Sequence, residues 1–170
     1  MSALNGRTAI VTGASSGIGL STARALVAEG ARVALGARRT ERLDEIAAEL
    51  GDGHVVHALD VTDADSSRAF VDSVVGELGR VDILVNNAGL ALGRTEIADG
   101  SDEDDAIMWE TNVLGLMRMT RLVLPHMEDG RGHIVNLGSW AGREAYAGGG
   151  MYVGSKTAVR ALTYVLRKEL

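Results

Sequence analysis

Short apolar runs alternate with amphipathic stretches along the whole chain. The apolar runs are rich in β-branched residues and lack polar alternation, which is typical of strands buried on both faces. We predict strands at residues 8–11, 33–35, 54–61, 81–85 and 133–137. The stretches between them have helical spacing, and we predict helices at residues 20–29, 41–50, 64–78, 108–127 and 152–170. This alternation predicts an α/β fold with a doubly wound parallel sheet in three layers, organised as one domain over residues 1–170.

The predicted helices carry recognisable start signals. Thr40 and Asp63 stand where N-cap residues are expected, just before residues 41–50 and 64–78. Residues 98–105 hold five acidic side chains ahead of the fourth helix. Carboxylates are stabilised near the positive end of the helix dipole, so we interpret this run as a solvated helix start. A metal site is the alternative interpretation.

The composition excludes several classes of function. A net charge of -6 argues against a nucleic-acid or anionic-membrane partner, because no basic stripe can neutralise phosphates. The chain has no cysteine, which excludes disulfides, thiolate nucleophiles and cysteine-bound zinc. Its four histidines lack metal-ligand spacing, so we predict no metal. Neither a signal peptide nor an apolar run of membrane-spanning length is apparent, and we expect a cytoplasmic protein.

A glycine-rich turn follows the first predicted strand. Its glycines, Gly13, Gly17 and Gly19, form the pattern G-x3-G-x-G and enclose Ser15, Ser16 and Ile18. Glycines at this place let backbone N–H groups and the helix N-terminus approach a pyrophosphate. The pattern departs from the G-x-G-x-x-G dinucleotide fingerprint, and a purely structural turn is the alternative. Its position at the first helix of an alternating chain favours cofactor binding.

Arg38 and Arg39 follow the second predicted strand, where a carboxylate selects for the unphosphorylated adenosine ribose. Here the acid is missing, and guanidinium groups are well suited to bind a phosphate. The sequence therefore predicts NADP(H) as the cofactor in preference to NAD. The alternative is that both arginines are merely exposed residues at a helix start.

Tyr152 and Lys156 are four residues apart in the last predicted helix, so they lie one turn apart on the same face. A nearby cation favours the phenolate form of a tyrosine, which could then exchange a proton with a hydroxyl or carbonyl oxygen. Ser139, upstream of this helix, could hold the same oxygen. Taken alone, such a pair is more commonly an ordinary amphipathic surface turn.

Four motifs together resemble the short-chain dehydrogenase/reductase family. They are T-G-x3-G-x-G from Thr12, N-N-A-G at residues 86–89, the serine at 139 and Tyr-x3-Lys at residues 152–156. The resemblance covers essentially the whole chain and implies a Rossmann fold and NADP-linked oxidoreductase activity. Family members are usually longer, so it also implies that the last strands of the family fold are absent.

The resemblance assigns roles to further residues. It implies that Asp60 and Val61 contact the adenine and that residues Asn87, Ala88 and Gly89 close the nicotinamide side. It implies that Lys156 binds the nicotinamide ribose and lowers the pKa of Tyr152. Asn112 would hold a water that links Lys156 to solvent. Structural alternatives remain open: Asp60 as a turn cap, Asn86 and Asn87 as ties between strands, and Asn112 as a buried amide.

Residues 108–115 and 146–152 are similar to a branch that includes NADP-dependent 3-hydroxy acid (serine-type) dehydrogenases and clavulanate-type aldehyde reductases. We therefore expect a small alcohol or carbonyl substrate. In the family, dimers form through helices that correspond to about residues 104–127 and 152–170, so a homodimer or homotetramer is expected. The competing hypothesis is an inactive NADP-binding fragment or scaffold on the same fold.

Overall fold

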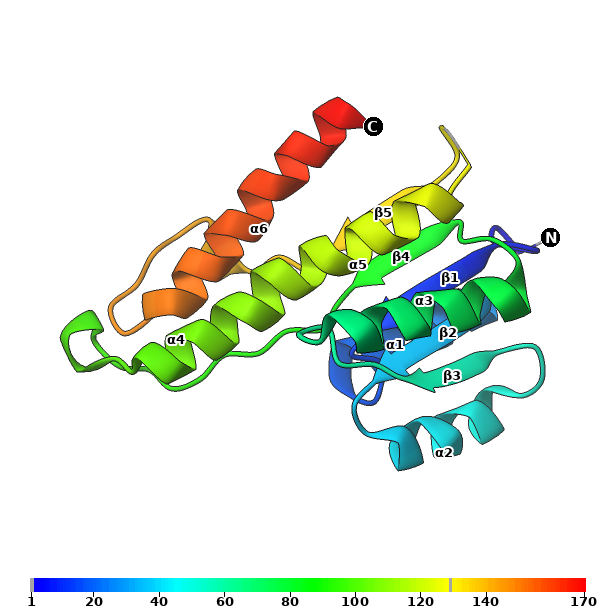
Figure 1. Cartoon of the computed structure of the whole chain (residues 1–170), viewed down its shortest axis with the longest axis horizontal. Coiled ribbons are helices and arrows are strands. Elements are labelled where there is room, and N and C mark those ends of the chain that lie inside the picture. Colours follow the sequence, from blue (N-terminus) through cyan, green and yellow to red (C-terminus); the bar gives the residue numbers. More distant parts are fainter. Residues whose placement is uncertain (1, 129) are drawn as a thin grey trace.

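The computed structural model describes residues 2–128 and 130–170, and a parallel sheet of five strands lies at its centre (Figure 1). The strands are β1 (Thr8–Thr12), β2 (Arg32–Ala37), β3 (Val55–Ala58), β4 (Ile83–Asn86) and β5 (His133–Asn136). Their order in the sheet is β3-β2-β1-β4-β5. The order reverses between β1 and β4, and the crevice at the carboxyl ends of strands at such a reversal is where doubly wound folds bind ligands.

Helices cover both faces of this sheet. They are α1 (Gly17–Ala28), α2 (Thr40–Leu50), α3 (Ala64–Leu78), α4 (Asp102–Trp109), α5 (Leu116–Val123) and α6 (Gly150–Glu169). Short 3-10 helices span Ile97–Asp99, Leu124–His126 and Trp140–Gly142. One layer is made by α1 and α2 and the other by α3 and α5, whereas α6 packs on α4 and on the segment that follows it (Figure 1).

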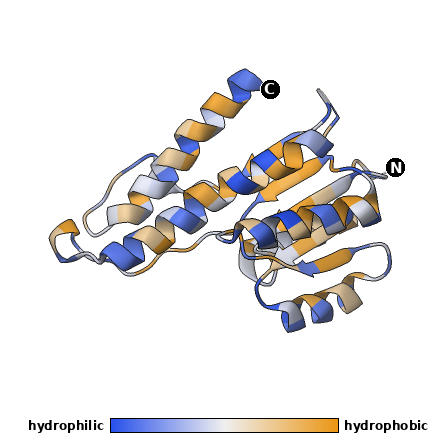
Figure 2. Ribbon diagram, in the orientation of Figure 1, coloured by the Kyte–Doolittle hydropathy of each residue, from blue (hydrophilic) through white to orange (hydrophobic). Residues whose placement is uncertain are grey.

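The core is divided between the two layers by the pleat of the strands. On β1, Ala9 and Val11 pack toward α1 and α2, while Ile10 packs toward α3 and α5 beside Phe70 and Met119. All five residues are almost fully buried, and Figure 2 shows the strands as largely hydrophobic. Burying each of the four larger side chains, all except Ala9, contributes about 1.5–3 kcal/mol. The prediction of a doubly wound α/β fold is confirmed.

The fourth predicted helix differs from the single helix expected over residues 108–127. It begins earlier, at Asp102, and a π-helix (Glu110–Gly115) interrupts it between α4 and α5. Ser101 caps its start, and the four carboxylates of residues 102–105 occupy its first turn. No cluster that could hold a metal ion occurs within the described residues. The Ser101 cap and the acidic first turn confirm the interpretation of the acidic run as a helix start.

The two predicted N-caps have different outcomes. The Asp63 carboxylate accepts a hydrogen bond of 2.7 Å from the Ser66 N–H, so this cap is confirmed. Thr40 is instead the first residue of α2, Arg39 occupies the N-cap position, and no side chain caps this helix. Among the helices that the structure describes, none is both long and apolar enough to cross a membrane.

Candidate active site

The loop after β4 is tied to the end of β1. The Asn87 Nδ2 atom donates hydrogen bonds to the Thr12 and Gly13 carbonyl oxygens at 2.8 and 3.1 Å. In return, the Thr12 Oγ1 atom accepts from the N–H groups of Asn87 and Ala88 at 3.0 and 2.9 Å. The two strand ends that flank the topological switch are thus joined by four hydrogen bonds, in line with the alternative that Asn87 links strands.

Two glycines of the turn after β1 allow this close contact. Gly13 has φ +64°, and a Cβ atom there would lie 2.9 Å from the Ala88 Cα atom. A Cβ atom at Gly19 would lie 2.4 Å from the Asn87 Nδ2 atom and 2.5 Å from the Gly13 carbonyl oxygen. Real Cβ atoms do not approach backbone so closely, so a side chain at either position would push the glycine turn away from the β4 loop.

A hollow of about 260 Å³ opens beside the glycine turn at the ends of β2 and β3. Its walls are Gly13, Ser15, Ser16, Ala37, Arg38, Arg39, Leu59, Asp60, Val61, Thr62, Ala88, Gly89, Leu90 and Thr111. We call it the adenosine-side hollow. It brings together the predicted glycine turn, the two arginines and the acid after β3, which are far apart in the sequence.

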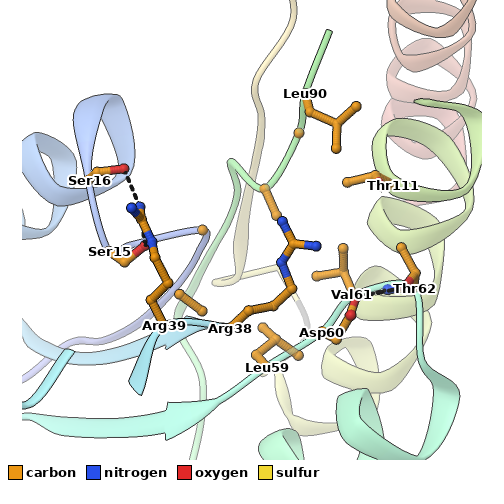
Figure 3. A pocket seen from close by; sticks show the side chains of 14 residues that line it. Ser15, Ser16, Arg38, Arg39, Leu59, Asp60, Val61, Thr62, Leu90 and Thr111 are labelled. Carbon is orange, nitrogen blue, oxygen red and sulfur yellow. Dashed lines mark hydrogen bonds between the residues drawn. The ribbon is translucent and has the colours of Figure 1, made fainter. Parts of the chain in front are cut away.

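The two arginines lie differently in the adenosine-side hollow (Figure 3). The Arg39 Nη2 atom donates to the Ser15 and Ser16 hydroxyl oxygens at 2.9 and 2.8 Å, so this side chain lies across the glycine turn. Arg38 extends into the hollow toward Val61, and no hydrogen bond joins it to another labelled side chain in Figure 3. Its guanidinium is therefore the more accessible of the two for a phosphate.

Asp60 takes part in a turn and also lines the hollow. Its Oδ1 atom accepts hydrogen bonds from the Thr62 N–H and hydroxyl at 2.9 and 2.7 Å. Burial opposes ionisation, but the two Thr62 hydrogen bonds and the charges of Arg38 and Arg118 outweigh it, so the pKa of Asp60 lies below its ordinary value. The structure thus agrees with the turn-cap alternative and still leaves the second carboxylate oxygen without a hydrogen bond among the described residues.

A second hollow, of about 340 Å³, continues from the first. Its walls are Gly13, Ser16, Ile18, Asn87, Ala88, Gly89, Leu90, Ala91, Leu137, Gly138, Tyr152 and Lys156. We call it the catalytic-side hollow. Five residues, from Gly13 to Leu90, line both hollows, so one continuous cleft leads from Arg38 to the predicted Tyr152 and Lys156 pair.

Lys156 is held in place at the inner wall of the catalytic-side hollow. The residue is only 7% exposed, and its Nζ atom donates a hydrogen bond of 2.8 Å to the Leu137 carbonyl oxygen. Burial lowers the pKa of the ammonium because it disfavours the charged form. A Cβ atom on Gly89 would lie 3.6 Å from this nitrogen, so the N-N-A-G loop passes directly over it.

Ser139 lies next to this wall but in an adjoining hollow of about 300 Å³, which Gly138 and Lys156 also line. Its hydroxyl oxygen accepts a hydrogen bond of 3.2 Å from the Ala141 N–H and caps the following 3-10 helix. The structure therefore places Tyr152 and Lys156 on one hollow, and Ser139 together with Lys156 on the adjoining one. This division cannot be read from the spacing along the chain.

Asn112 lies behind the cleft in the π-helix and is 2% exposed. Its amide pairs with both backbone groups of Leu90, accepting from the N–H and donating to the carbonyl at 2.8 Å each. It also donates to the Ser155 hydroxyl at 3.1 Å. This agrees with the buried-amide alternative, and it anchors the N-N-A-G loop to the helix that carries Lys156.

Sequence reasoning missed several residues of the cleft. Leu90, which lines both hollows, was recognisable only as the residue after N-N-A-G. Leu137 contributes its backbone oxygen rather than its side chain, so its residue type gives no signal. Thr111 belongs to the π-helix, which apolar periodicity did not reveal.

Comparison with known proteins places these observations in a family. The model of the short chain dehydrogenase family matches residues 7–170. The chain is 46% identical over 176 residues to an NADP-dependent 3-hydroxy acid dehydrogenase of Schizosaccharomyces pombe, covering 99% of this chain and 68% of that protein. It is 40% identical over 163 residues to a serine 3-dehydrogenase of Agrobacterium fabrum, covering 96% and 66%.

A solved structure agrees with these matches. The closed form of a serine dehydrogenase complexed with NADP+ has a TM-score of 0.92 and 43% identity, covering 96% of this chain and 66% of that one. The chain spans about two thirds of the length of the curated relatives. Their names agree with the predicted oxidoreductase class and cofactor. The family match and the identities show that the chain belongs to the short-chain dehydrogenase family.

Proposed function

We propose that the chain is an NADP-dependent oxidoreductase, a single dinucleotide-binding and catalytic domain that acts on a small alcohol or carbonyl substrate. The observation that carries this proposal is the continuous cleft, which has Arg38 and Arg39 at one end and Tyr152 and Lys156 at the other. The relatives named above, an NADP-dependent 3-hydroxy acid dehydrogenase and a serine 3-dehydrogenase, support a small 3-hydroxy acid as the substrate class.

The adenosine-side hollow fits the phosphorylated cofactor better than NAD. Arg38 and Arg39 stand at the end of β2, and neither Gly36 nor Ala37 supplies a carboxylate that would repel a 2′-phosphate. Arg38 would bind this phosphate, and Arg39 with Ser15 would complete the donors around it.

The N–H groups of the glycine turn, residues 15–19, would hold the pyrophosphate at the start of α1. Asp60 and Val61 would contact the adenine.

The catalytic-side hollow supplies proton transfer. When bound, NADP(H) gives or receives the hydride at the substrate carbon. Tyr152 would donate or accept the proton of the substrate oxygen, and Lys156 would bind the nicotinamide ribose hydroxyls. Ser139 would hold that oxygen and stabilise its developing charge. Asn87, Ala88 and Gly89 would close the nicotinamide side, while Asn112 would keep the loop over Lys156 in place.

We further propose a cytoplasmic homodimer or homotetramer assembled through α4, α5 and α6. Large apolar side chains are exposed there. Ile107 lies on α4, Leu114 lies on the π-helix that follows it, and Tyr164 and Val165 lie on α6. Exposed apolar residues gathered on neighbouring helices favour association. Light scattering measures the mass in solution, and a monomer at all concentrations would contradict this assembly.

The second candidate is an NADP-binding scaffold without turnover, and the position of Ser139 in the adjoining hollow favours it. One measurement tests the cofactor, which both candidates bind, and a second tests turnover, which separates them. NADP and NAD are titrated into the wild-type chain and into Arg38→Ala, and NADPH consumption is followed over a panel of small aldehydes and 3-keto acids. We expect tighter NADP binding that Arg38→Ala weakens. Equal affinities for both cofactors, unchanged by the substitution, would refute the NADP assignment.

A further variant separates the proton carrier from the binding site. Tyr152→Phe should abolish turnover and leave NADP binding unchanged, because only the phenolic proton is lost. NADP binding without any turnover in the wild type would favour the scaffold. Substantial turnover in Tyr152→Phe would refute the role of the tyrosine.

A further inference from the structure

The π-helix lies directly against the loop that follows β3. A Cβ atom on Gly115 would approach the Val61 side chain to 2.8 Å and the Val61 carbonyl oxygen to 3.0 Å. Val61 is 6% exposed and lines the adenosine-side hollow together with its neighbours Asp60 and Thr62. Only a glycine fits at this contact, so the wall of that hollow rests on the helix that holds Asn112.

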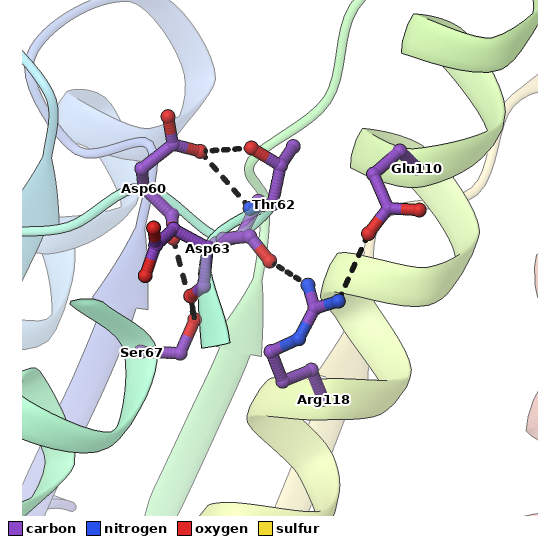
Figure 4. Close-up of polar contacts among 7 residues, drawn as sticks. Asp60, Thr62, Asp63, Ser67, Glu110 and Arg118 are labelled. Atoms are coloured by element: carbon purple, nitrogen blue, oxygen red, sulfur yellow. Dashed lines mark hydrogen bonds and ion pairs between the residues drawn. The ribbon is translucent and has the colours of Figure 1, made fainter. Parts of the chain in front are cut away.

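Arg118 forms hydrogen bonds to both segments that meet at this contact, the loop after β3 and the π-helix (Figure 4). One end of its guanidinium, Nη1, donates to the Val61 carbonyl oxygen, and the other, Nη2, donates to the Glu110 Oε1 atom at 2.9 Å. The Arg118 side chain is 23% exposed and the Glu110 side chain 38%, so the arginine is the better shielded partner of this ion pair. Among the described residues, Arg118 is the one whose side chain donates a hydrogen bond to the Val61 carbonyl oxygen. We call these three residues the Arg118 clasp.

The clasp depends on the π-helix. Residues eight apart in a regular α-helix differ by about 80° in direction, so Glu110 and Arg118 would not face the same side. A π-turn inserts one extra residue and removes most of this difference. The Glu110–Arg118 ion pair therefore stabilises the π-helical register itself, in which Asn112 reaches Leu90 and Ser155.

We propose that Arg118 is a positioning residue for the cofactor site, setting the distance between the Asp60–Thr62 wall and the π-helix that carries Asn112. This inference rests on the proposed function, in which the adenosine-side hollow binds the adenosine end of NADP. Arg118 acts through the Val61 backbone and does not touch the ligand. A planar fork with two fixed donors is required, because both acceptors must be held at once.

The test uses the adenosine half of the cofactor alone, adenosine 2′,5′-bisphosphate, titrated into the whole chain by calorimetry. Arg118→Met should weaken its binding by about tenfold, because losing the charge-assisted hydrogen bond to Val61 lowers the population of the binding-competent wall by about that factor. Glu110→Ala should weaken binding in the same direction, while Glu110→Gln keeps an acceptor for Nη2 and should restore most of it. Arg121→Met, on the same helix with an exposed side chain, is the matched control and should bind like the wild type.

If Arg118 only stabilised the fold, Arg118→Met would lower the unfolding midpoint. The molecules that remain folded would then bind the bisphosphate like the wild type. Circular dichroism at the titration temperature therefore establishes that each variant is folded, and Glu110→Ala stands in if Arg118→Met does not fold. Reduced nicotinamide mononucleotide, which lacks the adenosine half, should bind all folded variants equally.

The two proposals fail differently. If the wild-type chain binds no bisphosphate, the NADP assignment is wrong and the clasp falls with it. If the wild type and Arg38→Ala differ as expected but the Arg118 and Glu110 variants bind like the wild type, the clasp alone is overturned.

Discussion

The tie between β1 and β4 makes a sharp prediction for Asn87→Asp. The change replaces the amide nitrogen with a carboxylate oxygen of nearly the same size, which would then face the Thr12 and Gly13 carbonyl oxygens at 2.8 and 3.1 Å. Two attractive contacts become repulsive while the shape of the side chain is kept. The effect therefore isolates the hydrogen bonds from packing.

The magnitude follows from the two contacts. Asn87→Ala removes two hydrogen bonds at about 1 kcal/mol each, so it should lower the free energy of unfolding by about 2 kcal/mol. Asn87→Asp adds repulsion between a charge and two carbonyl dipoles, and we expect about 3–4 kcal/mol at neutral pH. The extra penalty of roughly 1.4 kcal/mol corresponds to a rise of about one unit in the pKa of the introduced carboxyl.

This rise fixes the direction of the pH dependence. Above the raised pKa the folded state carries the full penalty. As the pH falls through it, the folded chain takes up a proton more readily than the unfolded chain, so stability relative to the wild type recovers. The protonated carboxyl can then donate to the Thr12 carbonyl oxygen. Asn87→Ala has no such group and should show the same deficit at each pH.

Urea unfolding of the wild type and both variants at pH 7 and pH 4.5, followed by circular dichroism, measures these differences. At a slope of about 2 kcal/mol per molar urea, the Asn87→Asp midpoint should fall by about 1.5–2 M at pH 7. Equal midpoints for the two variants at both pH values would refute the hydrogen-bond geometry. A deficit that grows on acidification would also refute it.

Three further predictions concern stability and are measured by denaturant unfolding. Because burial lowers the pKa of Lys156, its ammonium destabilises the folded state at neutral pH. Lys156→Met should therefore match or exceed the wild type in stability while losing turnover. The wild type should gain stability as the pH rises toward the ordinary lysine pKa, and Lys156→Met should not. Asp63→Ala should cost about 1 kcal/mol by removing the cap on Ser66, whereas Asp65→Ala, which removes no cap, should cost little. Gly115→Ala should cost about 2–3 kcal/mol because of the contact with Val61, while Gly76→Ala in α3, where an added Cβ meets no atom within 4 Å, should be neutral or stabilising. A stable Gly115→Ala would contradict the close approach.

The fold was predictable because its signals are local. Residues 9–11 of the predicted strand are apolar, and all of β1 is buried, as a central strand must be. Tyr152 and Lys156 were predictable as a pair because helical spacing alone places them on one face. The glycine turn was predictable because its position between a strand and a helix gives the glycines a backbone role.

Other features depend on contacts between distant segments and could not be predicted. One residue inserted by the π-helix does not change the apolar pattern enough to be noticed over residues 108–127. The bond from Arg39 to Ser15 joins the loops that follow two neighbouring strands, β2 and β1, so the sequence could not distinguish its role from that of Arg38. The hollow in which Ser139 lies depends on how the loop after β5 meets α6.

The cleft draws its walls from the loops that follow β1, β2, β3 and β4, so no single segment forms even half of it. A ligand seated there has affinity for the folded chain and hardly any for partly unfolded forms. At a hundredfold excess over its dissociation constant, such a ligand raises the free energy of unfolding by about 2.7 kcal/mol. The thermal midpoint should consequently climb with the logarithm of ligand concentration, which makes heat denaturation a direct readout of occupancy.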